Sequence, residues 1–141
     1  MATVETLYLG ELRTLAKHVQ TGIEIITDAP LDNQGRGEAF SPSDLLAASL
    51  GSCMLTIMGI AARTHHFSID GTRIEITKVM AANPRRVAEV NIHFTMPAQT
   101  FTEHQKKIIQ LAATTCPVAL SIHPDIKQKT DFLFNDERVE V

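Results

Sequence analysis

Cysteine is scarce in this sequence, which has only two, Cys53 and Cys116, among its 141 residues. Two thiols are too few for the disulfide framework of a small secreted domain. They form neither a C-x-x-C motif nor the Cys and His spacing of a zinc site, so we expect no metal and no cofactor. The two thiols are therefore either inert core residues or a redox pair.

Positive charge is not in excess either. The formal net charge is −3, the isoelectric point is near 6.0, and the only adjacent basic residues are Arg85–Arg86 and Lys106–Lys107. This pattern argues against a surface for nucleic acid or for an anionic membrane. The first residues, MATVETLYLGELR, include acidic side chains and no long apolar run. We therefore expect no secretory signal and a cytoplasmic location.

One apolar run, from residue 41 to residue 62, is long enough to cross a membrane. It is interrupted by polar or small side chains, and the sequence has no second run of this kind. We therefore predict a core helix and not a membrane span. Because the helix is apolar on nearly every side, we expect protein to surround it. The interrupting residues are Asp44, Ser49, Gly51, Ser52 and Thr56.

The remaining pattern predicts both strands and helices, and a chain of 141 residues fits one ordinary domain or two very small ones. From Ala88 to Met96 apolar and polar residues alternate with a period of two, as in a strand with one buried face. The expected strands are a meander over 6–28, a hairpin over 71–79 and 85–97, and one further strand over 129–134. The expected helices cover 41–62, 100–115 and 116–126, with a loop over 28–40 and a tail over 137–141.

The helix starts carry clear signals. Ser41 can cap the long helix, Pro42 suits its first position, and Asp44 stands where a capping box needs a carboxylate. Thr102 can cap the next helix. Pro117 suits the first position of the short third helix, which places Cys116 at or beside its cap.

The two cysteines differ in their expected reactivity. Cys53 lies in the middle of an apolar helix, where free cysteine is usually an inert small hydrophobe. Small residues precede it, however, and allow another backbone or a substrate to approach the sulfur. Cys116 lies beside a helix start, where amide groups and the helix dipole favour a thiolate. From the residues alone, both interpretations stay open for both thiols.

Two segments resemble a known family. AFSPSDLLAASLGSC, followed far downstream by CPVALSI, is similar to the cysteine segments of the OsmC/Ohr family of thiol-dependent hydroperoxide reductases. The order of elements agrees along almost the whole chain: N-terminal strands, cysteine helix, strands, cysteine helix. The stretch TDAPLDNQGRGEAFSP resembles the small OsmC-like branch more than Ohr itself.

The resemblance implies an α+β, OsmC-like fold in a single domain over residues 1–141, built as an intertwined homodimer around the long cysteine helices, with a second antiparallel strand set. It implies that Cys53 attacks an organic hydroperoxide and becomes a sulfenic acid, and that Cys116 resolves it as a disulfide. An external dithiol would then reduce this disulfide, and a lipoyl protein is the partner that the family suggests.

The resemblance also implies an activating cation, because an unassisted thiol titrates near ~8.5. In the family, an arginine of the N-terminal strands does this and is oriented by a glutamate ten residues before the cysteine. Here Ser43 occupies that position and Asp44 the next. We therefore predict Arg13 and Asp44 as site residues, with Arg36 as a rival arginine. Glu38 is a further carboxylate, expected to be exposed.

Two other functions stay open. The missing glutamate and the apolar helix are compatible with a non-catalytic dimer that binds a small apolar ligand. The cysteines could also be core residues of a purely structural dimer. The histidines share no spacing and are expected on the surface or in satisfied positions: His18, His65, His66, His93, His104 and His123.

Overall fold

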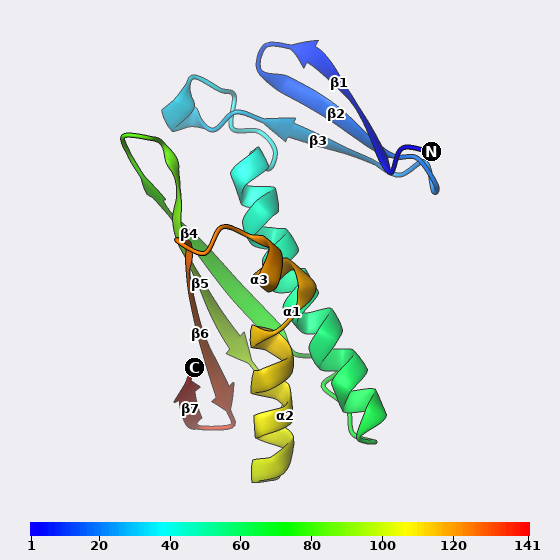
Figure 1. Cartoon of the computed structure of the whole chain (residues 1–141), viewed down its shortest axis with the longest axis vertical. Coiled ribbons are helices and arrows are strands. Elements are labelled where there is room, and N and C mark those ends of the chain that lie inside the picture. Colours follow the sequence, from blue (N-terminus) through cyan, green and yellow to red (C-terminus); the bar gives the residue numbers. More distant parts are fainter. The chain divides into compact units, whose positions relative to one another are not determined.

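The computed structural model of the chain describes residues 1–141, which divide into two compact units, Met1–Leu46 and Ala47–Val141. The fold is α+β, as predicted. The single domain over residues 1–141 stays a prediction. In chain order the elements (Figure 1) are β1 (Val4–Gly10), β2 (Arg13–His18), β3 (Glu24–Asp28), the 3₁₀ helix η1 (Leu31–Asn33), α1 (Pro42–Thr64), β4 (Arg73–Ala81), β5 (Arg86–Thr95), α2 (Glu103–Thr114), α3 (Pro117–Ser121), β6 (Lys127–Phe134) and β7 (Glu137–Glu140).

The first unit is an antiparallel meander in the order β1–β2–β3, which confirms the predicted strands. Glu11 and Leu12, between β1 and β2, have positive φ angles of 56° and 61°, the backbone of a tight hairpin turn. β2 then pairs with β3 in a register that puts Arg13 opposite Asp28. The loop from β3 to α1 contains only η1.

The helix α1 begins at the predicted signals. The backbone N–H of Ser41 donates to Asp44 Oδ2 at 2.9 Å, and the Asp44 N–H donates to Ser41 Oγ at 3.1 Å. This reciprocal pair satisfies two amide donors at the helix start. The carboxylate also complements the positive end of the helix dipole.

The second unit contains a four-stranded sheet in the order β4–β5–β6–β7. The β4–β5 hairpin is antiparallel, as predicted. β6 departs from the predicted antiparallel set and runs parallel to β5, because α2 and α3 form the crossover that parallel strands require. Residues 137–140 form β7 on β6, so the prediction of a tail is wrong there.

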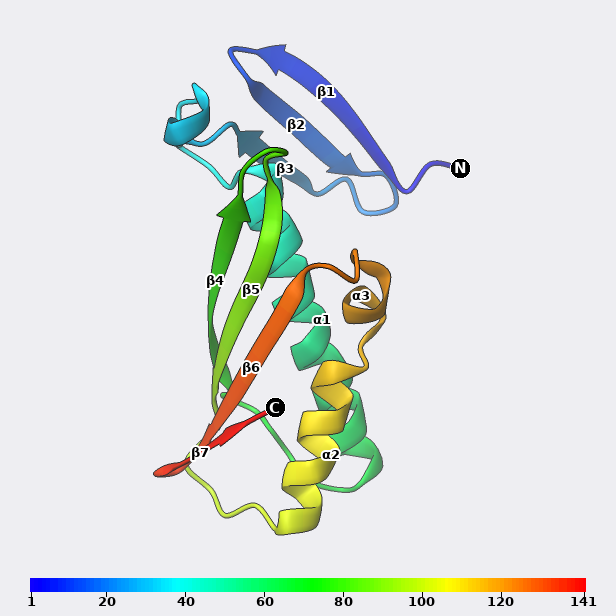
Figure 2. The ribbon, with the colours of Figure 1, turned by 60° about the vertical axis from the view of Figure 1, so that its left-hand side comes forward.

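The helices α1 and α2 lie on one face of this sheet (Figure 2). Alternating residues of β5 and β6 fill the space beneath them, and the rings of Phe94 and Phe132 stack with centroids 4.4 Å apart. On the helix side, Leu50, Met54 and Met58 are fully buried. The core of the second unit therefore lies between the sheet and α1.

The opposite face of α1 is open in the single chain. By length and composition α1 is apolar enough to cross a membrane, but here its apolar length packs on a sheet. The prediction that protein surrounds it is wrong for one chain, because small or polar side chains interrupt its outer face. The exposed residues of this face are Ser49, Ser52, Thr56, Ile60 and Arg63.

Candidate functional site

Cys53 lies in the middle of α1, half-buried and packed against the core of the second unit. Two residues earlier, a Cβ on the buried Gly51 would lie 2.4 Å from Ile76 Cδ1 and 2.8 Å from Ile74 Cδ1. Carbon atoms in contact are about 3.5–4.0 Å apart, so a methyl group would fit there only if these isoleucine side chains shifted. The missing side chain at Gly51 thus lets Ile74 and Ile76 of β4 pack closely against α1. The sequence had instead suggested that the small residues let a backbone or a substrate approach the Cys53 sulfur.

Cys116 is the N-cap of the five-residue helix α3, with Pro117 at the first position. Its sulfur accepts a hydrogen bond from the Ala119 N–H at 3.4 Å. The side chain is fully buried, at 0 % exposure. Gln128 Nε2 donates to the Ala119 carbonyl at 3.0 Å and so ties α3 to β6.

The structure brings the two cysteines together as free thiols. Burial raises the pKa of Cys116 above its ordinary value, and the hydrogen-bonded Cys53 side chain raises it further, while the Ala119 N–H lowers it. Desolvation therefore outweighs the helix start. The expectation that the helix start favours a thiolate at Cys116 is wrong. The two thiols also differ in exposure, since Cys53 is half-buried and Cys116 is fully buried.

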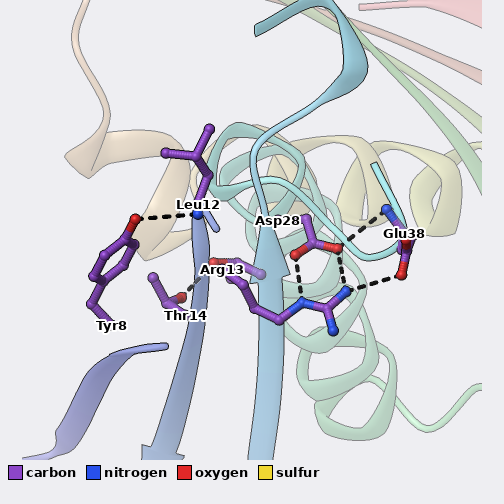
Figure 3. Close-up of polar contacts among 7 residues, drawn as sticks. Tyr8, Leu12, Arg13, Thr14, Asp28 and Glu38 are labelled. Carbon is purple, nitrogen blue, oxygen red and sulfur yellow. Dashed lines mark hydrogen bonds and ion pairs between the residues drawn. The ribbon is translucent and has the colours of Figure 1, made fainter. Parts of the chain in front are cut away.

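Arg13 is held by two carboxylates in the first unit (Figure 3). Its Nε donates to Asp28 Oδ1 at 2.7 Å and its Nη2 to Asp28 Oδ2 at 2.8 Å. Nη2 also donates to Glu38 Oε2 at 3.2 Å. Glu38 is exposed, as predicted, yet it forms part of this ion-pair cluster.

Asp28 is the buried centre of this cluster. Its side chain is 0 % exposed, against 22 % for Arg13. The hydrogen bond from Arg13 holds the pKa of Asp28 below its ordinary value, against a desolvation that raises it, and the N–H of Glu38 and the charge of Arg36 lower it further. The guanidinium pKa is raised in turn, chiefly by the hydrogen bond to Asp28.

The other predicted residues have clear places. Asp44 binds the N–H of Ser41 at the start of α1, and Ser43 Oγ lies 3.2 Å from Ser41 Oγ. Arg36, the rival arginine, is exposed in the loop and acts on Asp28 only as a nearby charge. Arg13 is therefore the arginine that the fold fixes.

Sequence reasoning missed Asp28. The sequence places it at the boundary between the predicted meander and the predicted loop, with no role in the site, and it is the last residue of β3. The signal was available in the strand pairing, because in the meander Arg13 and Asp28 face each other on neighbouring strands. Opposite charges directly across an antiparallel pair stabilise each other.

The histidines lie outside these clusters, as expected. His93 pairs with Asp131, which also binds Arg138. His123 Nδ1 accepts from the Asp125 N–H at 3.0 Å beyond α3.

Alkylation of the folded, reduced protein at neutral pH should modify Cys53 well before Cys116. Cys53 is half-buried, whereas Cys116 is fully buried and its pKa is raised. Only the thiolate reacts, and only where the reagent reaches it. Timed iodoacetamide quenches with peptide mass spectrometry would measure both rates. Equal rates in the folded protein, with equal rates in urea as the reference, would contradict this order.

Comparison with known proteins adds sequence and fold relatives. Residues 35–131 match the family model described as OsmC-like protein. The comparison with curated proteins gave no match. A structure from Psychrobacter arcticus 273-4, provisionally described as an osmotic stress induced and detoxification response protein, is 59 % identical, with a TM-score of 0.90 over 94 % of this chain and 96 % of that one.

Two more distant structures share the fold. The organic hydroperoxide resistance protein OsmC from Legionella pneumophila has a TM-score of 0.74 at 16 % identity, over 94 % of this chain and 97 % of its own. An organic hydroperoxide resistance protein from Elizabethkingia anophelis has a TM-score of 0.75 at 17 % identity, over 96 % and 98 % of the two chains.

Proposed function

The chain belongs to the OsmC-like protein family, and from this membership we propose that it serves oxidative-stress defence as a thiol-dependent peroxidase for organic hydroperoxides. The observation that carries the proposal is the pair of free thiols, Cys53 half-buried and Cys116 fully buried beside it. Two fold relatives named for organic hydroperoxide resistance support the substrate class.

In the first step, the Cys53 thiolate attacks the terminal oxygen of the hydroperoxide. The S–O bond forms as the O–O bond breaks, so the sulfur is oxidised to a sulfenic acid by two electrons. The alkoxide that leaves takes a proton and departs as the alcohol. Cys53 suits this role because the more exposed thiol is the one that a substrate reaches.

In the second step, the Cys116 sulfur attacks the sulfur of the sulfenic acid. The S–S bond forms, the S–O bond breaks, and the hydroxide leaves as water with the thiol proton of Cys116. Burial keeps Cys116 in its thiol form before this step, because it raises the pKa. An external dithiol, of which a lipoyl protein is the example, then reduces the disulfide and is itself oxidised.

Two other residues complete the proposed site. We also propose Arg13 as the activating cation, and the ion pair that fixes it on Asp28 supports that choice over Arg36. Asp44 supports the site indirectly, by capping the helix that carries Cys53. The open outer face of α1 supports a homodimer, and we place the protein in the cytoplasm.

The direct test is titration of the reduced protein with cumene hydroperoxide. We expect one equivalent per chain to remove both free thiols and to create an internal Cys53–Cys116 disulfide, because each turnover consumes two thiols. Ellman titration and peptide mapping without reductant would measure this. Both thiols intact in excess hydroperoxide, with a small apolar ligand retained in native mass spectrometry, would instead favour the binding function.

A further inference from the structure

Gln128 is a polar side chain on the core-facing side of β6, and its amide donates to the Ala119 carbonyl of α3 at 3.0 Å. We propose that Gln128 is the positioning residue for Cys116: it holds α3 where the Cys116 sulfur reaches Cys53. This inference rests on the proposed function, in which Cys116 condenses with the Cys53 sulfenic acid. Alternate residues of a strand share one face, and those that follow Gln128 on this face are buried: Thr130, Phe132 and Phe134.

The helix α3 needs a tie from outside. Its five residues, Pro117–Ser121, are too few for a helix that is stable by itself. The last four carbonyls of a helix also lack a partner within it, and the Ala119 carbonyl is one of them. Gln128 satisfies it from β6. Because β6 is paired with β5 on one edge and with β7 on the other, the tie leads to a strand that is itself well held.

Ala119 connects this tie to the sulfur. While its carbonyl accepts from Gln128, its own N–H donates to Cys116 Sγ at 3.4 Å. Two hydrogen bonds therefore lead from β6 through one residue to the thiol. Ala119 is only 9 % exposed and Cys116 is fully buried, so neither bond is readily replaced by a bond to water, and its loss leaves a polar group without a partner.

Burial makes the place of α3 decisive for the chemistry. Because Cys116 is fully buried, its thiol cannot swing through solvent to meet an oxidised Cys53. A disulfide also accepts only a narrow geometry, with the two Cβ atoms about 3.5–4.5 Å apart. The position of α3 thus sets the reach of the thiol. A displacement of a reacting group by about 1 Å can lower a rate about a hundredfold.

The alternative to resolution is a second oxidation of Cys53. The sulfenic sulfur attacks another hydroperoxide, and a second S–O bond forms as the O–O bond breaks. The sulfur becomes a sulfinic acid, the hydroperoxide leaves as the alcohol, and a thiol no longer reduces the product. Resolution by Cys116 competes with this step. Gln128 therefore protects Cys53 from irreversible oxidation by keeping Cys116 within reach.

The test is a single turnover of the reduced, full-length protein with one equivalent of cumene hydroperoxide, quenched at timed intervals. Dimedone labels the sulfenic acid, and peptide mass spectrometry without reductant separates it from the thiol and the disulfide. Gln128→Met keeps the side-chain length and removes the amide, so the Cys53 thiol should disappear at the wild-type rate. The disulfide should form about tenfold to a hundredfold more slowly, and excess hydroperoxide should leave sulfinic acid at Cys53.

Gln99→Met is the matched control. Gln99 Nε2 likewise donates to a backbone carbonyl, that of Ser68, at 2.9 Å, but this bond joins two exposed loop residues outside α3 and β6. The control removes the same kind of hydrogen bond without touching the helix that carries Cys116. Both steps should therefore keep their wild-type rates in Gln99→Met.

Gln128→Glu separates positioning from damage to the fold within one protein. An ionised carboxylate cannot donate to the Ala119 carbonyl, whereas the protonated acid can. Partial burial beside a carbonyl raises the pKa of a carboxyl. The resolving rate relative to wild type should therefore be low at pH 8 and recover toward pH 5, while the ratio for Gln128→Met stays the same at both pH values.

The outcomes separate the inference from the proposed function. A wild-type rate of disulfide formation in Gln128→Met would overturn the inference and leave the peroxidase function standing, as would a Gln128→Glu ratio that stays constant from pH 8 to pH 5. Equal slowing of both steps would also overturn it, because the cause would then be a general loss of structure. If the wild type forms neither sulfenic acid nor disulfide, the proposed function fails and the inference fails with it.

Discussion

Cys53→Ser should reduce hydroperoxide consumption to the rate of the buffer alone, while Cys116→Ser should stop after one event per chain. The serine hydroxyl is a far weaker nucleophile toward an O–O bond, so the first variant has no attacking group. The second keeps the Cys53 sulfur but lacks the thiol that condenses with the sulfenic acid. A hydroperoxide consumption assay with ferrous xylenol orange would measure both variants.

The two variants control for each other. Dimedone should label Cys53 in oxidised Cys116→Ser and give no label in oxidised Cys53→Ser, because Cys116 is buried and has a raised pKa. Circular dichroism should match the wild type in both, since sulfur and hydroxyl are similar in size. Full turnover in Cys53→Ser, or no dimedone label on Cys53 in Cys116→Ser oxidised without added thiol, would contradict the assigned roles.

Gly51→Val should destabilise the protein by about 1–3 kcal/mol or more, the range for overpacking a core. Even one added carbon would lie 2.4 Å from Ile76 Cδ1 and 2.8 Å from Ile74 Cδ1. Valine adds two further methyl groups and is stiff in a helix, so the side chains of Ile74 and Ile76, or the backbone of α1 or β4, must shift. Urea denaturation followed by circular dichroism would measure the loss.

Gly59→Ala is the matched control in the same helix. A Cβ at Gly59 meets nothing within 4 Å in this chain, so the substitution should raise stability by about 0.5–1 kcal/mol through helix propensity alone. If Gly51→Val is as stable as the wild type, the close approach of β4 to α1 is wrong. A loss of stability in Gly51→Val together with a gain in Gly59→Ala would confirm the close approach of β4 to α1.

Much of the fold could be read from local patterns. The capping box at Ser41 and Asp44, the alternation from Ala88 to Met96, and Pro117 at a helix start are short-range signals, and the structure confirms each. The parallel placement of β6 could not be read, because pairing across a crossover depends on which strand edge is free. That is a property of the assembled sheet.

The candidate site was read less completely for the same reason. The sequence predicted both cysteines and Arg13 as site residues but not Asp28, whose contact with Arg13 appears only when β2 and β3 are placed in register. The helix start predicted a lowered pKa for Cys116, but burial raises this pKa instead. Burial depends on the tertiary packing and cannot be read from a local sequence pattern. The structure also explains the glycine at position 51 by its packing against Ile74 and Ile76, and not by access to the Cys53 sulfur.

The parallel pairing of β5 and β6 sets the order in which the chain can fold. The β4–β5 hairpin closes a short loop, whereas the pairing of β6 with β5 spans the whole chain from Thr95 to Lys127. Closures over long sequence separations come late and slowly. Cys116 lies within that crossover, so we expect the thiol pair to be assembled near the end of folding. A chain that is still incomplete then holds two separate thiols, so the disulfide that we propose would form only once the sheet is finished.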